Sequence, residues 1–487
     1  MSQYPYKKLS LFILAAFFLS INITNAKELK TNRDFWSEWG ALLYLIDDEF
    51  KIKSPNFLLS YESPSLKKEL TLYIQYLRKN NTVCKYPARY NLLLKYNLIT
   101  KVQKKCPELT EYEKKAPINS FKYIYASESL TSITGMLGHG FLMGEYKNKG
   151  EEIIQHSFSF FTDLRQANQI TLAFDAFAFG MEGIFALKPY QQDLNRYLKT
   201  ENRNVWELEL DLTDHEVASL RNILWELRDV YPKYLFQSFN CATLTLYAIS
   251  IIKPEILNYQ IMFVTPLDIY QALTSLNLVR TTKVWSPTPE KVVNPAFRIQ
   301  DSLFGINYSR NGASLTFTPA SHYFRTIKQT NDKNSELLIS ALELDINKFK
   351  IKKLNLYELT NLNTNKTFSS KSVSIYMDNT NFDKNWFLSY NVGTSVKYKD
   401  NVFSVLPGIG FNATTSNPYL SLKLYYSINF THEIKASAFS EKKWFNSKTS
   451  IFEYNVTLSK RLNNYIFYLG FNKDEKIIVN VGLDYHF

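Results

Sequence analysis

The last third of the chain alternates apolar and polar residues. From residue 420 to 430 the even positions are all leucine, tyrosine, isoleucine or phenylalanine, and the odd positions between them are mostly polar. Residues 479–487 follow the same pattern and end on Phe487. A period of two predicts β-strands, and a run of eleven residues suits a tilted strand that crosses a bilayer. We count roughly ten such strands, the scale of a small barrel. We therefore expect residues 299–487 to form an antiparallel β-barrel in the outer membrane.

One alternative to a membrane barrel stays open at this point. A terminal aromatic residue on an alternating last strand resembles the insertion signal of bacterial outer-membrane barrels, which favours the membrane. A periplasmic sandwich could have the same strand content, because alternation does not say whether the apolar face meets lipid or a core.

The first part of the chain has helical periodicity instead. Residues 27–115 place apolar side chains three and four positions apart, at Trp36, Trp39, Leu43 and Ile46. This spacing predicts a small helical N-terminal domain.

The centre, residues 116–298, mixes strand and helix patterns. Residues 136–143 and 153–161 are predicted strands, and residues 213–227 are a predicted helix that starts with a capping box of Thr213 and Glu216. The predicted fold class is therefore α+β: a helical domain, a mixed domain and a β-barrel.

The N-terminus predicts export. Lys7 and Lys8 precede an apolar run at residues 11–19, and Thr24-Asn25-Ala26 offers small residues where a signal peptidase cleaves. Residues 1–26 are thus an expected signal peptide, and no later segment is apolar for long enough to form a transmembrane helix. The chain of 487 residues has a net charge of +12, and aromatic residues make up 15% of it. A basic, aromatic-rich surface suits anionic lipid, and no nucleic-acid motif is present.

Three cysteines in an exported chain leave one without a partner. Cys84 and Cys106 lie 22 residues apart in the helical region, and we expect them to form a disulfide. Cys241 would then be a free thiol, which is either a buried apolar residue or a group with a chemical use.

The sequence around Cys241 favours a nucleophile. Asn240 is a good helix cap, and an apolar helix follows it and stops before Pro254. The thiol thus lies at a helix N-terminus, where the dipole and free N–H groups favour thiolate and could hold an oxyanion. His139, in "GMLGHGFLMG", has small neighbours that let another group approach the imidazole. A histidine near the thiol would complete the activation.

Several blocks of the sequence resemble a known bacterial family. They are "ASESLTSITGMLGHGFLMG", "KPYQQDLNRYLKTENRNVWELELDLTDHEVASLRNILWEL" and "YLFQSFNCATLTLYAI", within about residues 120–290. They resemble the domain named for the periplasmic part of the Lnb lipoprotein N-acyltransferase, which is similar in a Gly-His strand, in Arg203 and Trp206, in residues 225–227 and in Asn240-Cys241. The segment "CKYPARYNLL" and the β-rich tail resemble the domains that usually accompany it. The resemblance implies a permuted papain-like fold with His139 as base and Cys241 as nucleophile.

Some assignments go beyond this resemblance. His156, in "IIQHSFSF", is a candidate third catalytic residue that would orient the base, against the alternative of an ordinary strand histidine. Asn240 is a candidate for contact with substrate or oxyanion. The chain also lacks the transmembrane helices of the acyltransferase proper and has a predicted barrel in their place, so its reaction and substrate can differ.

Function is expected to follow from the thiol. The first hypothesis is acyl transfer or hydrolysis through a Cys241 thioester, with membrane lipid or lipoprotein as partner at the outer membrane. The alternatives are a cell-wall peptidase or amidase of papain-like type and a non-catalytic outer-membrane binding module. No cofactor or metal is expected, because neither a zinc spacing nor a phosphate-binding or dinucleotide motif is present.

Overall fold

The computed structural model describes residues 35 to 487 apart from a set of internal gaps. These gaps are residues 80–81, 102–104, 130–134, 136, 149, 151, 163–179, 237, 260–263, 288–291, 293, 299–300, 328–334, 363, 365–367, 380–383, 400, 447–448 and 474–476. The predicted signal peptide, residues 1–26, lies outside the described residues.

The contacts divide the chain into two compact units. The first contains residues up to 119 together with 212–233 and 246–260, and the second contains 120–211, 234–245 and 261–487. The helix at 214–226, which we placed in the middle domain, therefore groups with the N-terminal helices. The two units are described separately below.

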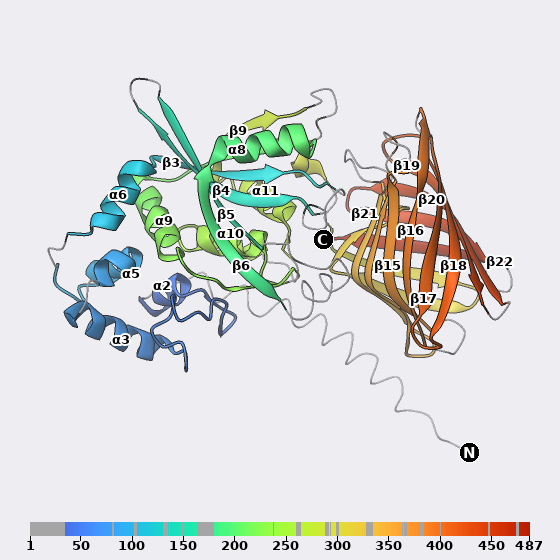
Figure 1. Cartoon of the computed structure of the whole chain (residues 1–487), viewed down its shortest axis with the longest axis horizontal. Coiled ribbons are helices and arrows are strands. Elements are labelled where there is room, and N and C mark those ends of the chain that lie inside the picture. The colour runs from blue at the N-terminus through green and yellow to red at the C-terminus, as the bar shows by residue number, and fades with distance from the viewer. Residues whose placement is uncertain are drawn as a thin grey trace, which may run out of the picture. The chain divides into compact units, whose positions relative to one another are not determined.

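The first unit is mainly helical (Figure 1). Its helices are α2 (Phe35–Leu42), α3 (Leu66–Lys79), α4 (Thr82–Lys85), α5 (Pro87–Lys95), α6 (Pro107–Lys115), α9 (Asp214–Glu226) and the 3-10 helix η5 (Pro254–Tyr259), with a small hairpin of β1 (Leu45–Ile46) and β2 (Glu49–Phe50). The predicted capping box starts α9: Thr213 accepts from the N–H of Glu216, and the Glu216 carboxylate accepts from the N–H of Thr213. Among the described residues, no helix is both long and apolar enough to cross a membrane.

A fully buried arginine holds the first unit together. The guanidinium of Arg89 bonds Glu69 on α3 at 3.0 Å and Glu226 on α9 at 3.1 Å, and it donates to the Phe57 carbonyl at 2.9 Å. The same two carboxylates accept backbone N–H groups, Glu69 from Leu59 and Ser60 and Glu226 from Ala88 and Arg89. Buried charges are stable when they are paired and hydrogen-bonded in this way. The segment "CKYPARY" is therefore fixed to α9 as well as to α3.

The disulfide lies in the same unit. Cys84 and Cys106 are joined, with 5.2 Å between their Cα atoms, and Cys241 is the free cysteine. The carbonyl of Cys84 also accepts the indole N–H of Trp225 on α9 at 2.8 Å. The crosslink thus fixes α4 and the start of α6 beside the Arg89 cluster.

The second unit begins with a seven-stranded sheet in the order β8-β6-β5-β4-β3-β7-β9. Its strands are β3 (Ser120–Ala126), β4 (His139–Lys147), β5 (Ile153–Thr162), β6 (Met181–Pro189), β7 (Val205–Leu210), β8 (Lys233–Tyr234) and β9 (Val279–Trp285). The two predicted strands correspond to β4 and β5, although β4 starts three residues later than expected.

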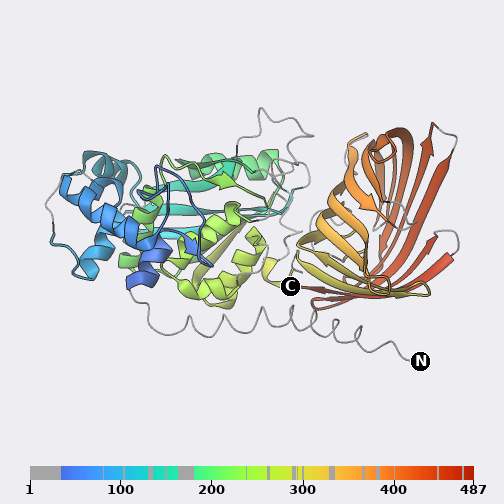
Figure 2. The same ribbon diagram turned by 90° about the horizontal axis from the view of Figure 1, so that it is seen from below.

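Helices lie on both faces of this sheet. On one face α8 (Tyr190–Asn195) and the π-helical turn η4 (Arg196–Thr200) pack into a core with strand residues, namely Ile124, Ala126, Phe141, Met143, Tyr190, Leu194, Tyr197 and Val205. On the other face α11 (Pro266–Ser275) lies against β3 and β4, where the Tyr123 hydroxyl donates to the Pro266 carbonyl at 2.7 Å. Figure 2 shows the cyan strands between green α8 and the yellow-green helix α11.

The rest of the second unit is a closed antiparallel barrel of twelve strands, two more than the ten we counted from the sequence (Figure 1). Its sheet is formed by β10 (Leu303–Ser309), β11 (Gly312–Thr318), β12 (Ala320–His322), β13 (Ser335–Asp345), β14 (Lys350–Asn361), β15 (Ser370–Asp378), β16 (Asn385–Tyr398), β17 (Asn401–Asn412), β18 (Asn417–Asn429), β19 (Ile434–Phe445), β20 (Ser450–Leu462), β21 (Tyr465–Lys473) and β22 (Ile477–His486). We count β11 and β12 as one strand because both pair with β13. The ring closes through β10, which pairs with both β11 and β22.

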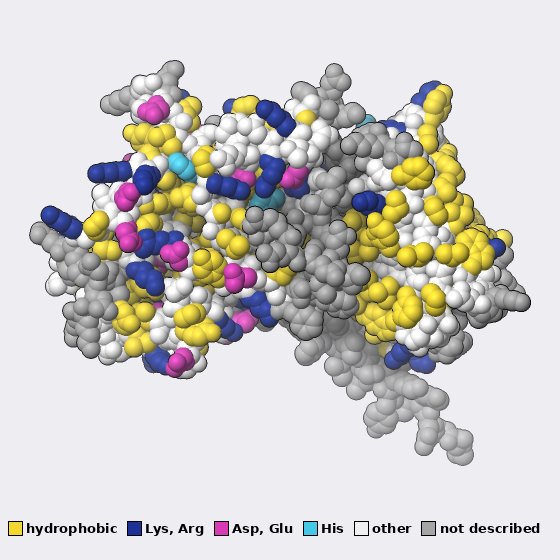
Figure 3. All heavy atoms as spheres, in the orientation of Figure 1, with side chains coloured by type: hydrophobic (Ala, Val, Ile, Leu, Met, Phe, Trp, Pro, Cys, Tyr) yellow, Lys and Arg dark blue, Asp and Glu magenta, His cyan; other side chains and the backbone are white. Residues whose placement is uncertain are grey.

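The barrel is apolar outside and polar inside. Along β18 the odd positions from Tyr419 to Ser427 are buried, whereas Leu420 is 62% and Tyr426 is 43% exposed. The buried positions of neighbouring strands are largely serine, asparagine, lysine and glutamate. On the barrel face seen in Figure 3, hydrophobic side chains predominate. A sandwich would bury its apolar side instead, so the barrel is confirmed and the sandwich alternative is wrong.

We predict that an arginine on the outer face of β18 hinders membrane insertion. Leu424→Arg should cost about 2 to 4 kcal/mol, because the guanidinium would face hydrocarbon near mid-membrane. The measurement is the folded fraction in phospholipid vesicles as a function of urea, read from heat-modifiable migration on a gel.

The control places the same residue one position earlier. Lys423 points into the lumen, where its ammonium donates to the Ser372 hydroxyl at 3.1 Å, so Lys423→Arg keeps the charge among polar groups. Equal loss of insertion in both variants would contradict the assignment of the two faces.

We predict that the disulfide stabilises the helical unit without affecting the free thiol. Replacing Cys84 and Cys106 by serine should lower the free energy of unfolding by about 2 to 4 kcal/mol, because the open chain gains conformational entropy when it unfolds. Denaturant unfolding followed by tryptophan fluorescence measures the loss. The rate at which Cys241 is alkylated should stay the same, and a large change in that rate would show that the bridge also shapes the thiol site.

Candidate thiol site

The candidate site starts at the N-terminus of α10 (Cys241–Ser250), and the residue that fixes it is Asn240. Its side-chain oxygen accepts the N–H groups of Ala242 at 2.8 Å and Thr243 at 3.0 Å, which is the cap predicted from the sequence. Its amide nitrogen donates to the carbonyls of Phe236 at 2.9 Å and Val264 at 3.2 Å. Both N–H donors of the amide are therefore used. The expected contact of Asn240 with an oxyanion is corrected to a structural role, because no side-chain proton is left for a ligand.

The thiol of Cys241 is buried among hydrogen-bond donors. The backbone N–H groups of Gly140, Ala242 and Cys241 itself point at the sulfur, and so does the hydroxyl of Tyr234. Burial raises the pKa of the Cys241 thiol, and these four donors oppose that rise because they favour the thiolate. The result is a neutral thiol in a setting that is already arranged for negative charge.

Gly140 lets this arrangement form. A Cβ atom at position 140 would collide with the hydroxyl of Tyr123 and would lie 3.2 Å from the Cβ of Pro266 on α11. The close approach that the small residues around His139 predicted is therefore real. It brings Tyr123 and α11 against β4, and it leaves the Gly140 N–H to the thiol.

His139 lies one residue before Gly140 and has different surroundings. Its ring is 5.6 Å from Phe141 and 6.3 Å from Tyr197, so it packs beside the core under α8 and η4. Burial, with a smaller effect of nearby cations, lowers the pKa of His139 to about 3. In the part of the chain that the structure describes, no hydrogen bond joins the imidazole to the Cys241 thiol. The structure brings Cys241 to the residue next to His139, and the pairing of thiol and imidazole stays a prediction.

The charged groups around His139 are mainly cations. Lys188, Arg196 and Arg203 act on its imidazole, and Asp193 pairs with the first two at 2.8 and 3.4 Å. Arg203 is 3% exposed and bonds Glu201 at 2.6 Å, while its Nε and Nη1 atoms have no partner. Among the described residues, no group of three or more His, Cys, Asp or Glu side chains is placed to hold a metal ion.

His156 lies too far along the sheet to orient His139. It pairs with Gly144 of β4 and Pro189 of β6, five residues along β4 from His139, which is about 16 Å at the rise of an extended strand. Its Nδ1 atom is buried without a partner, and burial lowers its pKa. The expected orienting role of His156 is therefore corrected: it is a strand histidine outside the thiol site.

Sequence reasoning missed two groups at the sulfur. The first is the hydroxyl of Tyr234, one of several aromatic residues before Cys241, and nothing in the local pattern singles it out. The second is the Gly140 N–H, for which the glycine itself was the available signal. Trp206, which the resemblance includes, is buried and contacts the rings of Tyr125 and Tyr270, so it supports the core.

We predict that Cys241 titrates above an ordinary cysteine and that Tyr234 limits the shift. Alkylation of the folded protein by iodoacetamide should keep accelerating as the pH rises past 9, because thiolate is the reactive form and burial disfavours it. Tyr234→Phe removes one donor to the thiolate. It should raise the midpoint of the pH–rate profile by about half to one pKa unit, or slow labelling about three- to tenfold at a fixed pH below the midpoint.

The matched control is Tyr231→Phe. Tyr231 is 51% exposed, lies three residues earlier and undergoes the same chemical change, so its profile should equal that of the wild type. A wild-type midpoint below pH 8, or equal shifts in both variants, would contradict this description of the sulfur.

Comparisons with known proteins agree with the resemblance in the sequence. The family model described as Lnb N-terminal periplasmic domain matches residues 108–276, and no curated protein matches the chain. Solved structures similar to the chain include the KdgM porin with disordered oligogalacturonate, at 14% identity and a TM-score of 0.28, covering 38% of this chain and 98% of the porin. The NanC porin has 7% identity and a TM-score of 0.27 with the same coverage, and an anion-selective porin from Comamonas acidovorans has 9% and 0.20, covering 76% of this chain and 98% of the porin. The chain is an envelope protein whose residues 108–276 belong to the Lnb N-terminal periplasmic domain family and whose C-terminal barrel lies in the outer membrane.

Proposed function

We propose that Cys241 is the nucleophile of an acyltransferase or acyl hydrolase that works through a thioester. The observation that carries this proposal is the set of four donors around one buried sulfur, from Gly140, Ala242, Cys241 and Tyr234. A structural cysteine needs no such donors, whereas a nucleophile needs them to stabilise the thiolate and then the oxyanion of the tetrahedral intermediate. The family match supports the same proposal, because the family is named for a lipoprotein N-acyltransferase.

The reaction would have two steps. The Cys241 thiolate attacks the carbonyl carbon of an acyl ester, so that a carbon–sulfur bond forms and the carbonyl oxygen becomes an oxyanion. When this intermediate collapses, the bond to the alcohol oxygen breaks, the alcohol leaves with a proton, and the acyl group stays on sulfur as a thioester. Water or an amine then attacks the thioester and restores the thiol. The N–H groups of Gly140 and Ala242 are the candidates for holding the oxyanion.

His139 is the proposed base. Its lowered pKa keeps the imidazole neutral at pH 7, which is the form that accepts a proton. A pKa of about 3 describes a weak base, and a neighbouring thiolate would raise it, because an opposite charge favours the imidazolium. The imidazole therefore has to turn from Phe141 and Tyr197 toward the sulfur beside Gly140. Such a turn fits apo sites, in which catalytic hydrogen bonds are often long or unformed.

A lipid or lipoprotein acyl group is the proposed donor. The outer-membrane barrel keeps the chain at a lipid surface, and the cations Lys188 and Arg196 lie near His139 on the same sheet. Cationic side chains at an envelope surface favour anionic head groups. This choice of donor also follows the resemblance to the acyltransferase domain.

We predict that the protein forms a covalent acyl adduct at Cys241. The full-length protein in detergent is incubated with phospholipid, and intact mass followed by peptide mass mapping identifies the modified residue. We expect an added fatty-acyl mass on Cys241 in the wild type. Cys241→Ala should abolish the adduct, and His139→Ala should slow its formation at least about a hundredfold, as the loss of a general base does.

The matched control is His156→Ala, which removes a histidine from the neighbouring strand outside the site. It should form the adduct at the wild-type rate. A peptide-derived adduct after incubation with peptidoglycan fragments would favour the amidase instead. An unmodified Cys241 with every donor, in protein that remains folded, would rule out thioester catalysis and leave the binding module.

A further inference from the structure

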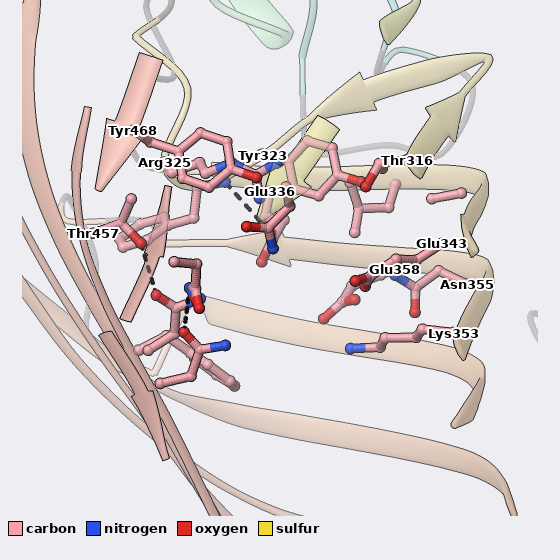
Figure 4. A pocket seen from close by; sticks show the side chains of 18 of the residues that line it. Thr316, Tyr323, Arg325, Glu336, Glu343, Lys353, Asn355, Glu358, Thr457 and Tyr468 are labelled. Atoms are coloured by element: carbon pink, nitrogen blue, oxygen red, sulfur yellow. Dashed lines mark hydrogen bonds between the residues drawn. The ribbon is translucent and has the colours of Figure 1, made fainter. Parts of the chain in front are cut away.

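The barrel contains a polar cavity that the thiol site does not use. Its volume is about 250 Å³, it is partly open, and it is lined from seven strands and from the segment after β12. Figure 4 shows side chains of Thr316, Glu336, Lys353, Asn355 and Thr457 directed into it. A barrel of this size could leave an open channel, and what closes this one decides what it can do.

Residues 323–327 form the floor of the cavity. Phe324 is buried and packs against Val402, Leu406 and Tyr425 from the barrel wall. Arg325 donates to Asp484 of β22 at 2.9 and 3.2 Å, and its guanidinium lies over the rings of Tyr323 and Tyr468. An apolar anchor and a buried ion pair thus fix this segment across the lumen. The cavity is therefore a cup with a floor rather than part of a continuous pore.

The lining carries no net charge. Three cations, Arg325, Lys352 and Lys353, are balanced by the three carboxylates Glu336, Glu343 and Glu358. Lys352 and Glu343 pair with each other at 2.7 Å. A ligand with a single charge would gain little from such walls, because each attractive group stands near an opposing one.

The remaining polar groups are amides and hydroxyls. Five asparagines line the cavity with threonine, serine and tyrosine side chains, the asparagines being Asn307, Asn355, Asn455, Asn472 and Asn480. Asn355 is 5% exposed, and its side-chain oxygen has no hydrogen-bond partner; the side-chain oxygen of Asn307 has none either. Buried oxygens without partners are costly, so these two atoms call for a donor from outside the chain.

We propose that the barrel cup binds a short uncharged saccharide. Hydroxyl and acetamido groups both donate and accept, which matches asparagine amides and supplies protons to the oxygens of Asn355 and Asn307. The rings of Tyr323 and Tyr468 offer apolar faces for the C–H face of a sugar ring. The volume is at the lower end for ligand sites, so the bound part is one or two rings. This binding is separate from the thiol chemistry and does not depend on it.

The experiment is titration calorimetry of the full-length protein in detergent micelles with three matched disaccharides. They are chitobiose, which is neutral, digalacturonate, which is anionic, and the deacetylated chitosan dimer, which is cationic. We expect saturable binding of chitobiose and at least about tenfold weaker binding of both charged sugars. Preference for either charged sugar, or no saturable binding of chitobiose, would overturn the proposal.

Variants locate the binding in the cup. Asn355→Leu removes the amide at nearly the same volume and should weaken chitobiose about tenfold or more. Asn429→Leu makes the same change on β18 outside the lining and should bind as the wild type does. Heat-modifiable migration confirms that both barrels are folded. Equal affinity in all three proteins would overturn the assignment to the cup, as would steady ion conductance of the wild type in planar bilayers, since a floored cup conducts no ions.

Discussion

The candidate site depends on the buried side chain of Asn240. One amide satisfies the first N–H groups of α10 and, through its nitrogen, holds the carbonyls of Phe236 and Val264. These bonds fix where the helix begins, and they therefore fix where the Cys241 sulfur lies relative to Gly140. Loss of the amide would leave two buried carbonyls and two N–H groups unsatisfied, each at about 1 to 3 kcal/mol. A residue that seemed suited to touch substrate is better explained as the one that positions the nucleophile.

Buried polar groups have different consequences in different parts of the chain. Around Arg89 nearly every donor finds a carboxylate or carbonyl, and the result is a rigid connection between α3, α5 and α9. Arg203 and Asn355 are equally buried but retain unpaired atoms. Satisfied groups of this kind stabilise structure, while unsatisfied ones occur where a ligand or a change of conformation can complete them. This contrast separates the structural cluster from the two regions for which we propose function.

The barrel could be predicted from the sequence, but its strand number could not. Strands such as β18 and β22 keep a strict period of two, because one side meets lipid and the other meets polar lumen groups. Irregularities interrupt this period between Glu343 and Leu344 of β13 and between Asn355 and Tyr357 of β14. Each shift moves the following residues to the opposite face, so the alternation appears to end within a strand that continues. Lumen-facing charges on β14 weaken the pattern further, which explains why ten strands were counted and twelve are present.

Local signals also predicted the start of α10 and the thiol at its first turn, because caps and helix ends depend on neighbouring residues. The direction of His139 depends on distant pairing instead: β3 and α11 determine which face of β4 meets the sulfur. In the observed arrangement the pKa of His139 is lowered and the pKa of Cys241 is raised, so both groups are uncharged at pH 7. A neutral buried thiol resists oxidation, since the thiolate is the reactive form, and this protects a lone cysteine in an oxidising compartment. Activation would then require the imidazole to reach the sulfur, and a substrate that displaces His139 from Phe141 and Tyr197 would couple its own binding to the formation of the nucleophile.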